Sequence, residues 1–198
     1  MLRLKKIAIT GGIASGKSAV CQIFQELGAY GVDTDTIVHE LLTPDTPVGQ
    51  QVVRLLGTDI LRDGKLSRRK IADKVFKDSE TLHALEQILH PAVYEQLEQL
   101  YQKLSERYYA FVVEVPLLFE VGWEKLFDVT IAVSSEREIC KKRFREAGHS
   151  DQEYDLRMKR HFSPEEKAHR ADFVVSNNGS LSHLRKQILT ITREVFSS

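Results

Sequence analysis

The stretch GGIASGKS at residues 11–18 restricts the possible folds of this chain more than any other feature. An apolar run at residues 7–10 precedes it and predicts a short buried strand, and apolar residues at helical spacing follow it as far as Leu27. The positions that match the spacing G-x-x-x-x-G-K-[ST] are Gly11, Gly16, Lys17 and Ser18. Glycines let backbone N–H groups approach phosphate oxygens, and the N-terminus of a helix adds partial positive charge. The strand, the loop and the helix together predict a site for a nucleoside triphosphate.

The chemistry of this loop assigns roles to its residues. We expect the nucleoside triphosphate to contact all eight of them: Gly11, Gly12, Ile13, Ala14, Ser15, Gly16, Lys17 and Ser18. Lys17 is expected to be catalytic, because an ammonium group at this position reaches the β and γ phosphates. Ser18 is expected to supply a hydroxyl to Mg²⁺. Glu114, in the later apolar run FVVEV, is expected near the metal and to act through a Mg²⁺-bound water.

Short apolar runs alternate with helical patterns along the chain, which predicts an α/β fold. Five strands are expected, at residues 7–10, 30–32, 111–115, 129–133 and 173–175. Buried strands separated by helices favour a parallel sheet with helices on both faces. Residues 35–107 read as mostly helical and are too long for a simple crossover, so we expect an inserted helical subdomain.

Local signals divide the predicted helices. Ser67 and Asp78 are expected N-caps, Asp63-Gly64 a turn, and Pro91 the first position of a helix that follows His90. In the second half, Ser135 is expected to open a helix, Ser163 to cap another, and residues 181–195 to form the last one.

Composition excludes several classes of protein. The 198 residues suit one domain, and 28 Lys and Arg balance 28 Asp and Glu, so no net charge favours nucleic acid or an anionic membrane. Cys21 and Cys140 show no metal-ligand or CxxC spacing and read as ordinary thiols. No apolar run reaches the roughly 18 residues that a membrane span needs. We therefore expect a cytoplasmic protein without a nucleic-acid, membrane or obligate protein partner.

Two further groups of polar residues mark a candidate site. Asp33 and Asp35 follow the second predicted strand, at the edge of the sheet where α/β proteins bind ligands. We expect both on extended chain but with separate roles: Asp33 is the candidate functional carboxylate, and Asp35 either caps a helix near Thr36 or has a functional role. Four of the five residues 141–145 are basic, and they form either a solvated helix face or a lid that clamps phosphate.

The phosphate-binding loop does not by itself identify the reaction. A GTPase is expected to carry an NKxD base-reading motif, and the nearest candidate, at residues 177–180, lacks its Lys and Asp. A small-molecule kinase needs an acceptor pocket, a group that orients the acceptor hydroxyl, and a cationic lid. Three readings remain open at this point: a kinase of another small molecule, a nucleoside or nucleotide kinase, and an ATP-dependent binding switch.

Several strings of residues resemble the dephospho-coenzyme A kinase family. In order along the chain they are GGIASGKS, LGAYGVDTD, DGKLSRRKIADKVF, LHP, PLLFE and ADFVVSNNG. The resemblance implies a P-loop kinase domain over residues 1–198, with a helical coenzyme-A-binding subdomain at 36–107 and a lid at 140–165. It also implies ATP-dependent phosphorylation of the ribose 3′-hydroxyl of dephospho-CoA, the last step of coenzyme A synthesis.

The resemblance assigns residues to that reaction. It implies that Asp33 is the catalytic carboxylate, that Arg143 reaches the transferring phosphoryl group, and that Asn178 lies in the nucleotide site. The residues that it places near the acceptor substrate are Asp33, Asp35, His90, Pro116, Leu117, Leu118 and Glu120. The chain departs from the family pattern at two positions: Ala147 stands where a second lid arginine is usual, and His161 where a glutamine is common.

Overall fold

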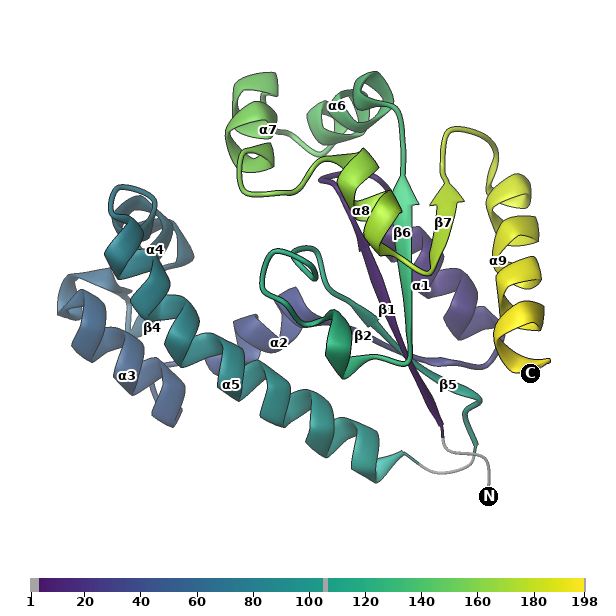
Figure 1. The fold of residues 1–198 in the computed structure, drawn as a ribbon. Coiled ribbons are helices and arrows are strands. Elements are labelled where there is room, and N and C mark those ends of the chain that lie inside the picture. Colours follow the sequence, from purple (N-terminus) through teal and green to yellow (C-terminus); the bar gives the residue numbers. More distant parts are fainter. Residues whose placement is uncertain (1–3, 105–106, 198) are drawn as a thin grey trace. The chain divides into compact units, whose positions relative to one another are not determined.

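The computed structural model describes residues 4–104 and 107–197. Figure 1 shows the elements in chain order. The elements are β1 (Lys5–Gly11), α1 (Lys17–Glu26), β2 (Tyr30–Asp33), α2 (Thr34–Leu41), α3 (Pro47–Leu56), η1 (Thr58–Ile60), β3 (Leu61–Arg62), β4 (Lys65–Leu66), α4 (Arg68–Val75), α5 (Ser79–Lys103), β5 (Ala110–Glu114), η2 (Glu124–Leu126), β6 (Val129–Ser134), α6 (Arg137–Glu146), α7 (Asp151–Met158), α8 (Pro164–Arg170), β7 (Phe173–Ser176) and α9 (Leu181–Phe196). The described residues form two compact units, one of residues 34–104 and one of residues 4–33 and 107–197.

The larger unit contains a five-stranded parallel sheet in the order β2-β5-β1-β6-β7 (Figure 1). β1 is the central strand, and its residues Ile7, Ala8 and Ile9 are completely buried. The inner strands β1, β5 and β6 are buried on both faces and need continuous apolar runs, which made them visible in the sequence. All five predicted strands are confirmed, with ends that differ by up to two residues.

Helices cover both faces of this sheet. Side chains alternate along β1, so Ile7 and Ile9 face one side and Ala8 and Thr10 the other. Ile7 and Ile9 belong to the apolar cluster that α1 and α9 complete. On the opposite side, the Thr10 hydroxyl lies 3.3 Å from the ammonium of Lys167 in α8. The predicted fold class is therefore confirmed.

The smaller unit is built from α2 to α5 and a two-stranded hairpin. Its core contains Val52 and Leu56 of α3, with Ile71 of α4 and Leu85 of α5 packed against them. The antiparallel strands β3 and β4 form the hairpin that was not predicted. They are joined by the predicted Asp63-Gly64 turn, whose residues both have positive φ.

The predicted starts of α4 and α5 are confirmed. The Ser67 hydroxyl accepts the Lys70 N–H, and the Asp78 carboxylate accepts the N–H groups of Glu80 and Thr81. Such side-chain acceptors satisfy N–H groups that have no partner in the first turn of a helix.

The position of Pro91 in a first helical turn was predicted wrongly. Pro91 lies in the middle of α5, which continues for 25 residues. A proline in a helix removes one hydrogen bond, at a cost of about 3 kcal/mol. The buried residues Leu85, Val93 and Leu97 continue along one face of α5 on both sides of Pro91. Their burial compensates for the lost hydrogen bond, so the helix does not end there.

Within the part of the chain that the structure describes, no helix combines the length and apolar composition required to cross a membrane.

Candidate active site

The phosphate-binding loop connects the end of β1 to the start of α1. Gly16 precedes α1 with φ of 97°. A Cβ atom at this position would lie 2.0 Å from Nδ2 of Asn177. Only glycine fits, because the backbone conformation and the close approach of Asn177 both exclude a side chain. Asn177 follows β7, is buried, and donates from Nδ2 to the carbonyl of Ser15 at 2.8 Å.

Ser15 lies in the middle of this loop and is almost completely buried. Its hydroxyl has no hydrogen-bond partner among the described residues. An unpaired buried hydroxyl is costly unless a partner arrives from outside the chain. A polar ligand in the loop, such as a phosphate group, would supply one.

Lys17 and two carboxylates meet at the edge of the sheet. The Lys17 ammonium donates to the carbonyl of Gly12 at 3.1 Å and lies 4.0 Å from Oε1 of Glu114. Glu114 is the last residue of β5, and Asp33, the last residue of β2, is paired with it in register. Paired residues of neighbouring strands point to the same face of a sheet. The larger unit therefore places the predicted lysine and both predicted carboxylates together.

The charges of this region affect the thiol of Cys21 in α1. Burial raises the pKa of its thiol above the ordinary value, and the negative charges of Glu114 and Asp33 act in the same direction. The thiol stays protonated at neutral pH and contributes no nucleophile. Both Cys21 and Cys140 are free and buried, as expected of ordinary thiols.

Asp35 was expected on extended chain, and this expectation is wrong. α2 begins at Thr34, directly after Asp33, so Asp35 lies in the first turn of the helix and is exposed. The alternation of side chains along a strand therefore does not apply to it. A carboxylate in a first helical turn interacts favourably with the positive end of the helix dipole.

Arg143 of α6 contacts the backbone of the phosphate-binding loop. Its guanidinium donates to the carbonyls of Ala14 and Ser15, each at 3.4 Å. It also donates to the Ser135 hydroxyl at 3.2 Å and to the Asn177 carbonyl at 2.9 Å. In this arrangement the arginine braces the loop and connects it to the segments that follow β6 and β7.

Asn178 supports the start of α6. Its side-chain oxygen accepts the Glu136 N–H at 2.8 Å and lies 3.0 Å from the Ser135 hydroxyl. Ser135 was expected to open this helix, but α6 begins at Arg137 and Ser135 instead bonds to the loop after β7. The contacts that hold the start of α6 join segments more than 40 residues apart, which no local pattern could show.

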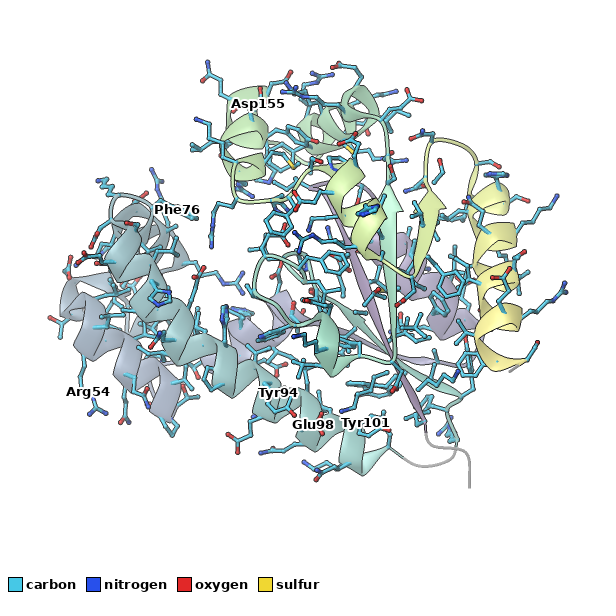
Figure 2. The ribbon with its side chains drawn as sticks, in the orientation of Figure 1. Arg54, Phe76, Tyr94, Glu98, Tyr101 and Asp155 are labelled. Atoms are coloured by element: carbon cyan, nitrogen blue, oxygen red, sulfur yellow. The ribbon has the colours of Figure 1, made fainter. Side chains whose placement is uncertain are left out.

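The basic residues of α6 pair mainly with α7. Lys141 lies 3.0 Å from Asp155, which is labelled in Figure 2, and Arg145 bonds to both carboxylate oxygens of Asp151 at 2.9 Å. These ion pairs hold α6 and α7 together across the turn at Gly148. For two of the four basic residues at 141–145, these ion pairs give a role that needs neither a bound phosphate nor a fully solvated helix face.

A small apolar cluster connects α6 and α7 to the phosphate-binding loop. Cys140, Phe144 and Tyr154 form its buried centre. Ile13 and Ala14 of the loop and Met158 of α7 pack against it. The side chains at the tip of the loop are thus part of the packing of the segment that was expected to form a lid.

The PLLFE segment after β5 contributes mostly to internal contacts. Leu118 is completely buried, and Leu117 is half-buried. The Glu120 carboxylate accepts the Phe162 N–H at 2.7 Å and pairs with the Lys167 ammonium at 2.9 Å. Burial lowers the pKa of Lys167, although the charge of Glu120 acts in the opposite direction.

His161 lies within the same charged region. Burial is the main cause that lowers its pKa to about 4, and the positive charges of Lys167 and Lys17 add to the effect, while Glu120 opposes it. Its Nδ1 atom is buried and has no partner among the described residues. The imidazole is therefore neutral at physiological pH.

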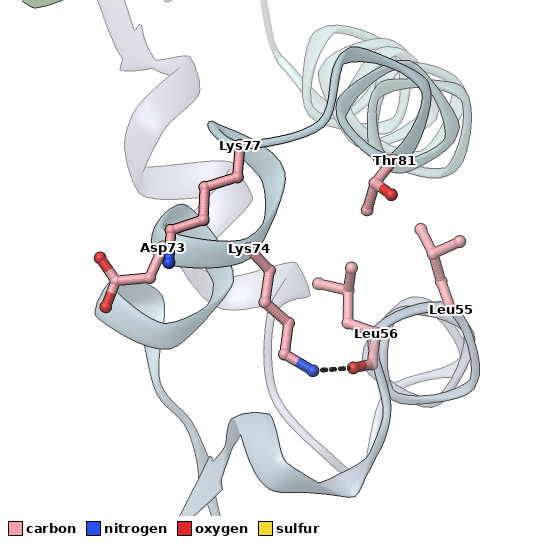
Figure 3. A pocket seen from close by; sticks show the side chains of 6 residues that line it. All are labelled: Leu55, Leu56, Asp73, Lys74, Lys77 and Thr81. Carbon is pink, nitrogen blue, oxygen red and sulfur yellow. Dashed lines mark hydrogen bonds between the residues drawn. The ribbon is translucent and has the colours of Figure 1, made fainter.

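The smaller unit has a pocket of its own, with a volume of about 430 Å³. Figure 3 shows its lining residues, Leu55, Leu56, Asp73, Lys74, Lys77 and Thr81. The Lys74 ammonium bonds to the Leu56 carbonyl and to Asp59. His90, the predicted acceptor-site residue of this unit, lies in α5 and does not line the pocket.

Sequence reasoning missed Asn177 and Lys167. The sequence offered Asn177 only as the neighbour of Asn178, and nothing local marked it as the residue that bonds to the phosphate-binding loop. Lys167 carried no signal, because a lysine in a charged stretch normally faces solvent. Its burial, with 1% of its surface exposed, depends entirely on Glu120 and Thr10 being brought to it.

Comparison with known proteins identifies the family. The Dephospho-CoA kinase family model matches residues 5–183. A dephospho-CoA kinase of Protochlamydia amoebophila (strain UWE25) is 48% identical over 199 residues, which cover 98% of this chain and 98% of that protein.

Solved structures agree with this result. TT1252 from Thermus thermophilus is 31% identical, covers 100% of both chains and superposes with a TM-score of 0.88. Dephospho-CoA kinase from Campylobacter jejuni is 26% identical, covers 97% of both chains and has a TM-score of 0.70. The resemblance noted in the sequence is thereby confirmed. The chain is a kinase, and it belongs to the dephospho-CoA kinase family.

Proposed function

We propose that this chain transfers the γ-phosphoryl group of ATP to the ribose 3′-hydroxyl of dephospho-CoA, which yields coenzyme A and ADP. The observation that carries the proposal is the meeting of Lys17, Glu114 and Asp33 at one edge of the sheet, next to the phosphate-binding loop. Membership of the family supports the choice of acceptor. Phosphoryl transfer needs little covalent chemistry from the protein, so positioned charges of this kind are sufficient.

The loop from Gly11 to Ser18 binds the phosphates of ATP in this proposal. The Lys17 ammonium exchanges the Gly12 carbonyl for β and γ phosphate oxygens and stabilises the charge that spreads over them in the transition state. Arg143 has the same task at the transferring phosphoryl group, and its present contacts place it beside the loop backbone. Asn178 lies close to the nucleotide and shapes that end of the site.

Mg²⁺ fits the donors that are present. Ser18 is exposed at the start of α1, and Glu114 is a partly buried carboxylate, so both offer the oxygen ligands that this ion prefers. Ser18 would bind the ion directly, and Glu114 would hold one of its waters. When bound, Mg²⁺ neutralises part of the phosphate charge.

Asp33 orients the acceptor in this mechanism. An alcohol is a poor nucleophile, and an aspartate carboxylate is too weak a base to deprotonate it before attack. The transition state of phosphoryl transfer is loose, so early deprotonation is not needed. Asp33 therefore holds the 3′-hydroxyl in line with the γ-phosphate and accepts its proton late in the reaction.

The remaining proposals concern the acceptor site and the lid. The helical unit of residues 34–104 binds the coenzyme A moiety, with His90 and Asp35 among its contacts. In the larger unit, Pro116, Leu117, Leu118 and Glu120 lie near the acceptor in this proposal. Of these four residues, Leu117 has the clearest access to a ligand, because Leu118 is buried and Glu120 is paired. Residues 140–165 act as a lid that excludes water from the transferring phosphoryl group.

Coupled assays of ADP release with ATP and Mg²⁺ test the function. The acceptor panel is dephospho-CoA, adenosine, uridine and shikimate. We expect acceptor-dependent ADP release with dephospho-CoA alone. Release with a nucleoside and none with dephospho-CoA would assign a nucleoside kinase, and slow acceptor-independent hydrolysis would indicate a binding switch.

Two variants test the catalytic carboxylate. Asp33→Asn keeps the shape and a hydrogen-bonding oxygen but cannot accept the proton, so we expect kcat to fall about 10²- to 10⁴-fold with ATP affinity almost unchanged. Asp35→Asn tests the role of Asp35 separately. If its carboxylate only stabilises the first turn of α2, kcat should change far less than in Asp33→Asn, and if it contacts the acceptor, the acceptor KM should rise. A loss mainly of ATP affinity in Asp33→Asn would instead place that residue in the metal site.

A further inference from the structure

The buried Lys167 connects separate segments of the larger unit. Its ammonium donates to the Pro116 carbonyl at 2.7 Å and to the Thr10 hydroxyl at 3.3 Å. It also pairs with Glu120, at 2.9 Å from Oε1 and 3.2 Å from Oε2. A lysine has three N–H donors. These three partners therefore account for all of them.

The partners of Lys167 lie directly beside the catalytic elements. Thr10 is the residue before Gly11, where the phosphate-binding loop leaves β1. Pro116 is two residues after Glu114, where the chain leaves β5. β1 and β5 are neighbours, with Ile9 paired to Glu114, and the Thr10 hydroxyl also lies 3.3 Å from the Pro116 carbonyl. Lys167 thus joins the segment that carries the loop to the segment that carries Glu114.

Glu120 extends this connection to the chain that returns from α7. Its Oε1 atom accepts the Phe162 N–H at 2.7 Å. The Phe162 ring lies under the guanidinium of Arg170, at 4.6 Å. At the other end of the same segment, the Met158 methyl lies 3.6 Å from the place that a Cβ on Gly12 would occupy. The segment of residues 158–162 therefore lies against the loop at one end and is bonded to Glu120 at the other.

Stability alone does not explain a buried ion pair at this place. An apolar pair of similar volume is often as stable as a buried ion pair, because both charges must be removed from water. An apolar side chain could not, however, donate to the Pro116 carbonyl and the Thr10 hydroxyl. Compared with an apolar residue, Lys167 therefore adds directed hydrogen bonds to these two oxygen atoms.

We propose that Lys167 is a positioning residue of the kinase reaction, which sets the phosphate-binding loop relative to Glu114 and, through Glu120, fixes the segment after α7. The inference rests on the proposed function for its kinetic part only. In this arrangement the Glu120 carboxylate is bonded to Lys167 and Phe162, so Glu120 acts near the acceptor by positioning the chain and not by a direct contact with the acceptor.

The test uses the double variant Lys167→Met/Glu120→Gln in the full chain. It removes both charges together, so no unpaired buried charge remains, and the glutamine oxygen still accepts the Phe162 N–H. Lys186→Met is the matched control, because Lys186 is exposed on α9. For each protein we measure the melting temperature, ATP affinity by calorimetry without acceptor, steady-state kinetics, and amide hydrogen exchange at residues 11–18.

We expect the double variant to stay folded and to bind ATP within about threefold of wild type. Its kcat should fall about 10²-fold with little change in KM for dephospho-CoA, because displacements of about 1 Å in an active site have effects of this size. Amide exchange in residues 11–18 should accelerate in the double variant and not in Lys186→Met.

Three outcomes would overturn the proposal. The first is a folded double variant whose kcat and amide exchange equal those of wild type. The second is a parallel loss of ATP affinity, kcat and melting temperature. The third is a rise in the acceptor KM at unchanged kcat. The last outcome would assign Glu120 to acceptor binding. If the wild-type protein itself fails to phosphorylate dephospho-CoA, the proposed function fails, and hydrogen exchange still decides the positioning role.

Discussion

Replacing Gly16 by alanine should destabilise the protein through two separable effects. Gly16 has φ of 97°, a conformation that costs an L-residue roughly 1–2 kcal/mol. The new Cβ would also lie 2.0 Å from Nδ2 of Asn177. Asn177 must then move and lose its buried bond to the Ser15 carbonyl, which costs about 1–3 kcal/mol. The two effects together predict a loss of about 3 kcal/mol in the free energy of unfolding.

Gly148→Ala separates the strain from the contact. Gly148 has φ of 89°, close to that of Gly16, but nothing lies within 4 Å of an added Cβ. We expect this control to lose only about 1 kcal/mol. For a chain of this size, about 1 kcal/mol corresponds to roughly 2–4 °C in Tm. Urea unfolding followed by circular dichroism, together with Tm, measures both variants.

A double variant identifies the cause of the difference. Asn177→Ala removes the side chain that the new Cβ would strike, while its backbone carbonyl still accepts from Arg143. We expect Gly16→Ala/Asn177→Ala to lose about 1–2 kcal/mol less than the sum of the single variants, because the contact is counted twice in that sum. The reasoning is refuted if Gly16→Ala is no more destabilised than Gly148→Ala, or if the two single losses simply add.

Three further changes probe the site. Lys17→Ala should lower kcat about 10²-fold or more at saturating ATP, because it removes a positioned cation from the phosphates. Circular dichroism should show a folded protein, and near-wild-type kinetics would contradict the P-loop assignment. Arg143→Ala should lower kcat more than it raises the acceptor KM, as expected if Arg143 clamps the transferring phosphoryl group. It should also lower the free energy of unfolding in urea by about 1–2 kcal/mol, because the carbonyls of Ala14 and Ser15 lose a charged donor. Unchanged kinetics and unchanged stability together would exclude both roles of Arg143. His161→Gln should flatten the dependence of stability on pH. The pKa of His161 is about 4 in the folded state and lies below the ordinary value of about 6.5 expected in the unfolded state. Between these two pH values only the unfolded state binds the proton. The stability that is present above about pH 6.5 is therefore lost as the pH falls toward 4. After allowance for partial exposure, wild type should lose about 1 kcal/mol from this group between pH 7 and pH 5, and equal pH dependence in the two proteins would exclude a buried neutral imidazole.

Much of the fold could be predicted because its signals are local. The inner strands β1, β5 and β6 are buried on both faces, so each is a continuous apolar run whatever its neighbours are. The edge strands β2 and β7 are more exposed, and their apolar stretches are shorter. The cap residues Ser67 and Asp78 bond to N–H groups two or three residues away, and such contacts depend on the local chain alone. Pro91 marks the limit of this reasoning, since packing along α5 outweighs a local preference.

The sequence by itself determined the phosphate-binding loop and the family. A loop that binds phosphate uses glycines, one lysine and one hydroxyl within eight consecutive residues, so the whole pattern is contiguous in the chain. The carboxylates Asp33 and Glu114 were visible for a similar reason, because each one ends a strand and the ends of parallel strands meet at one edge.

Only the tertiary structure decided which partners the remaining polar groups have. Asn177 rather than Asn178 contacts the loop, Arg143 bonds to loop carbonyls, and Lys167 is buried against Thr10 and Glu120. Each of these contacts joins residues that lie tens of residues or more apart in the chain. A polar side chain looks the same in the sequence whether it faces water or a buried partner, and burial in the folded chain makes the difference.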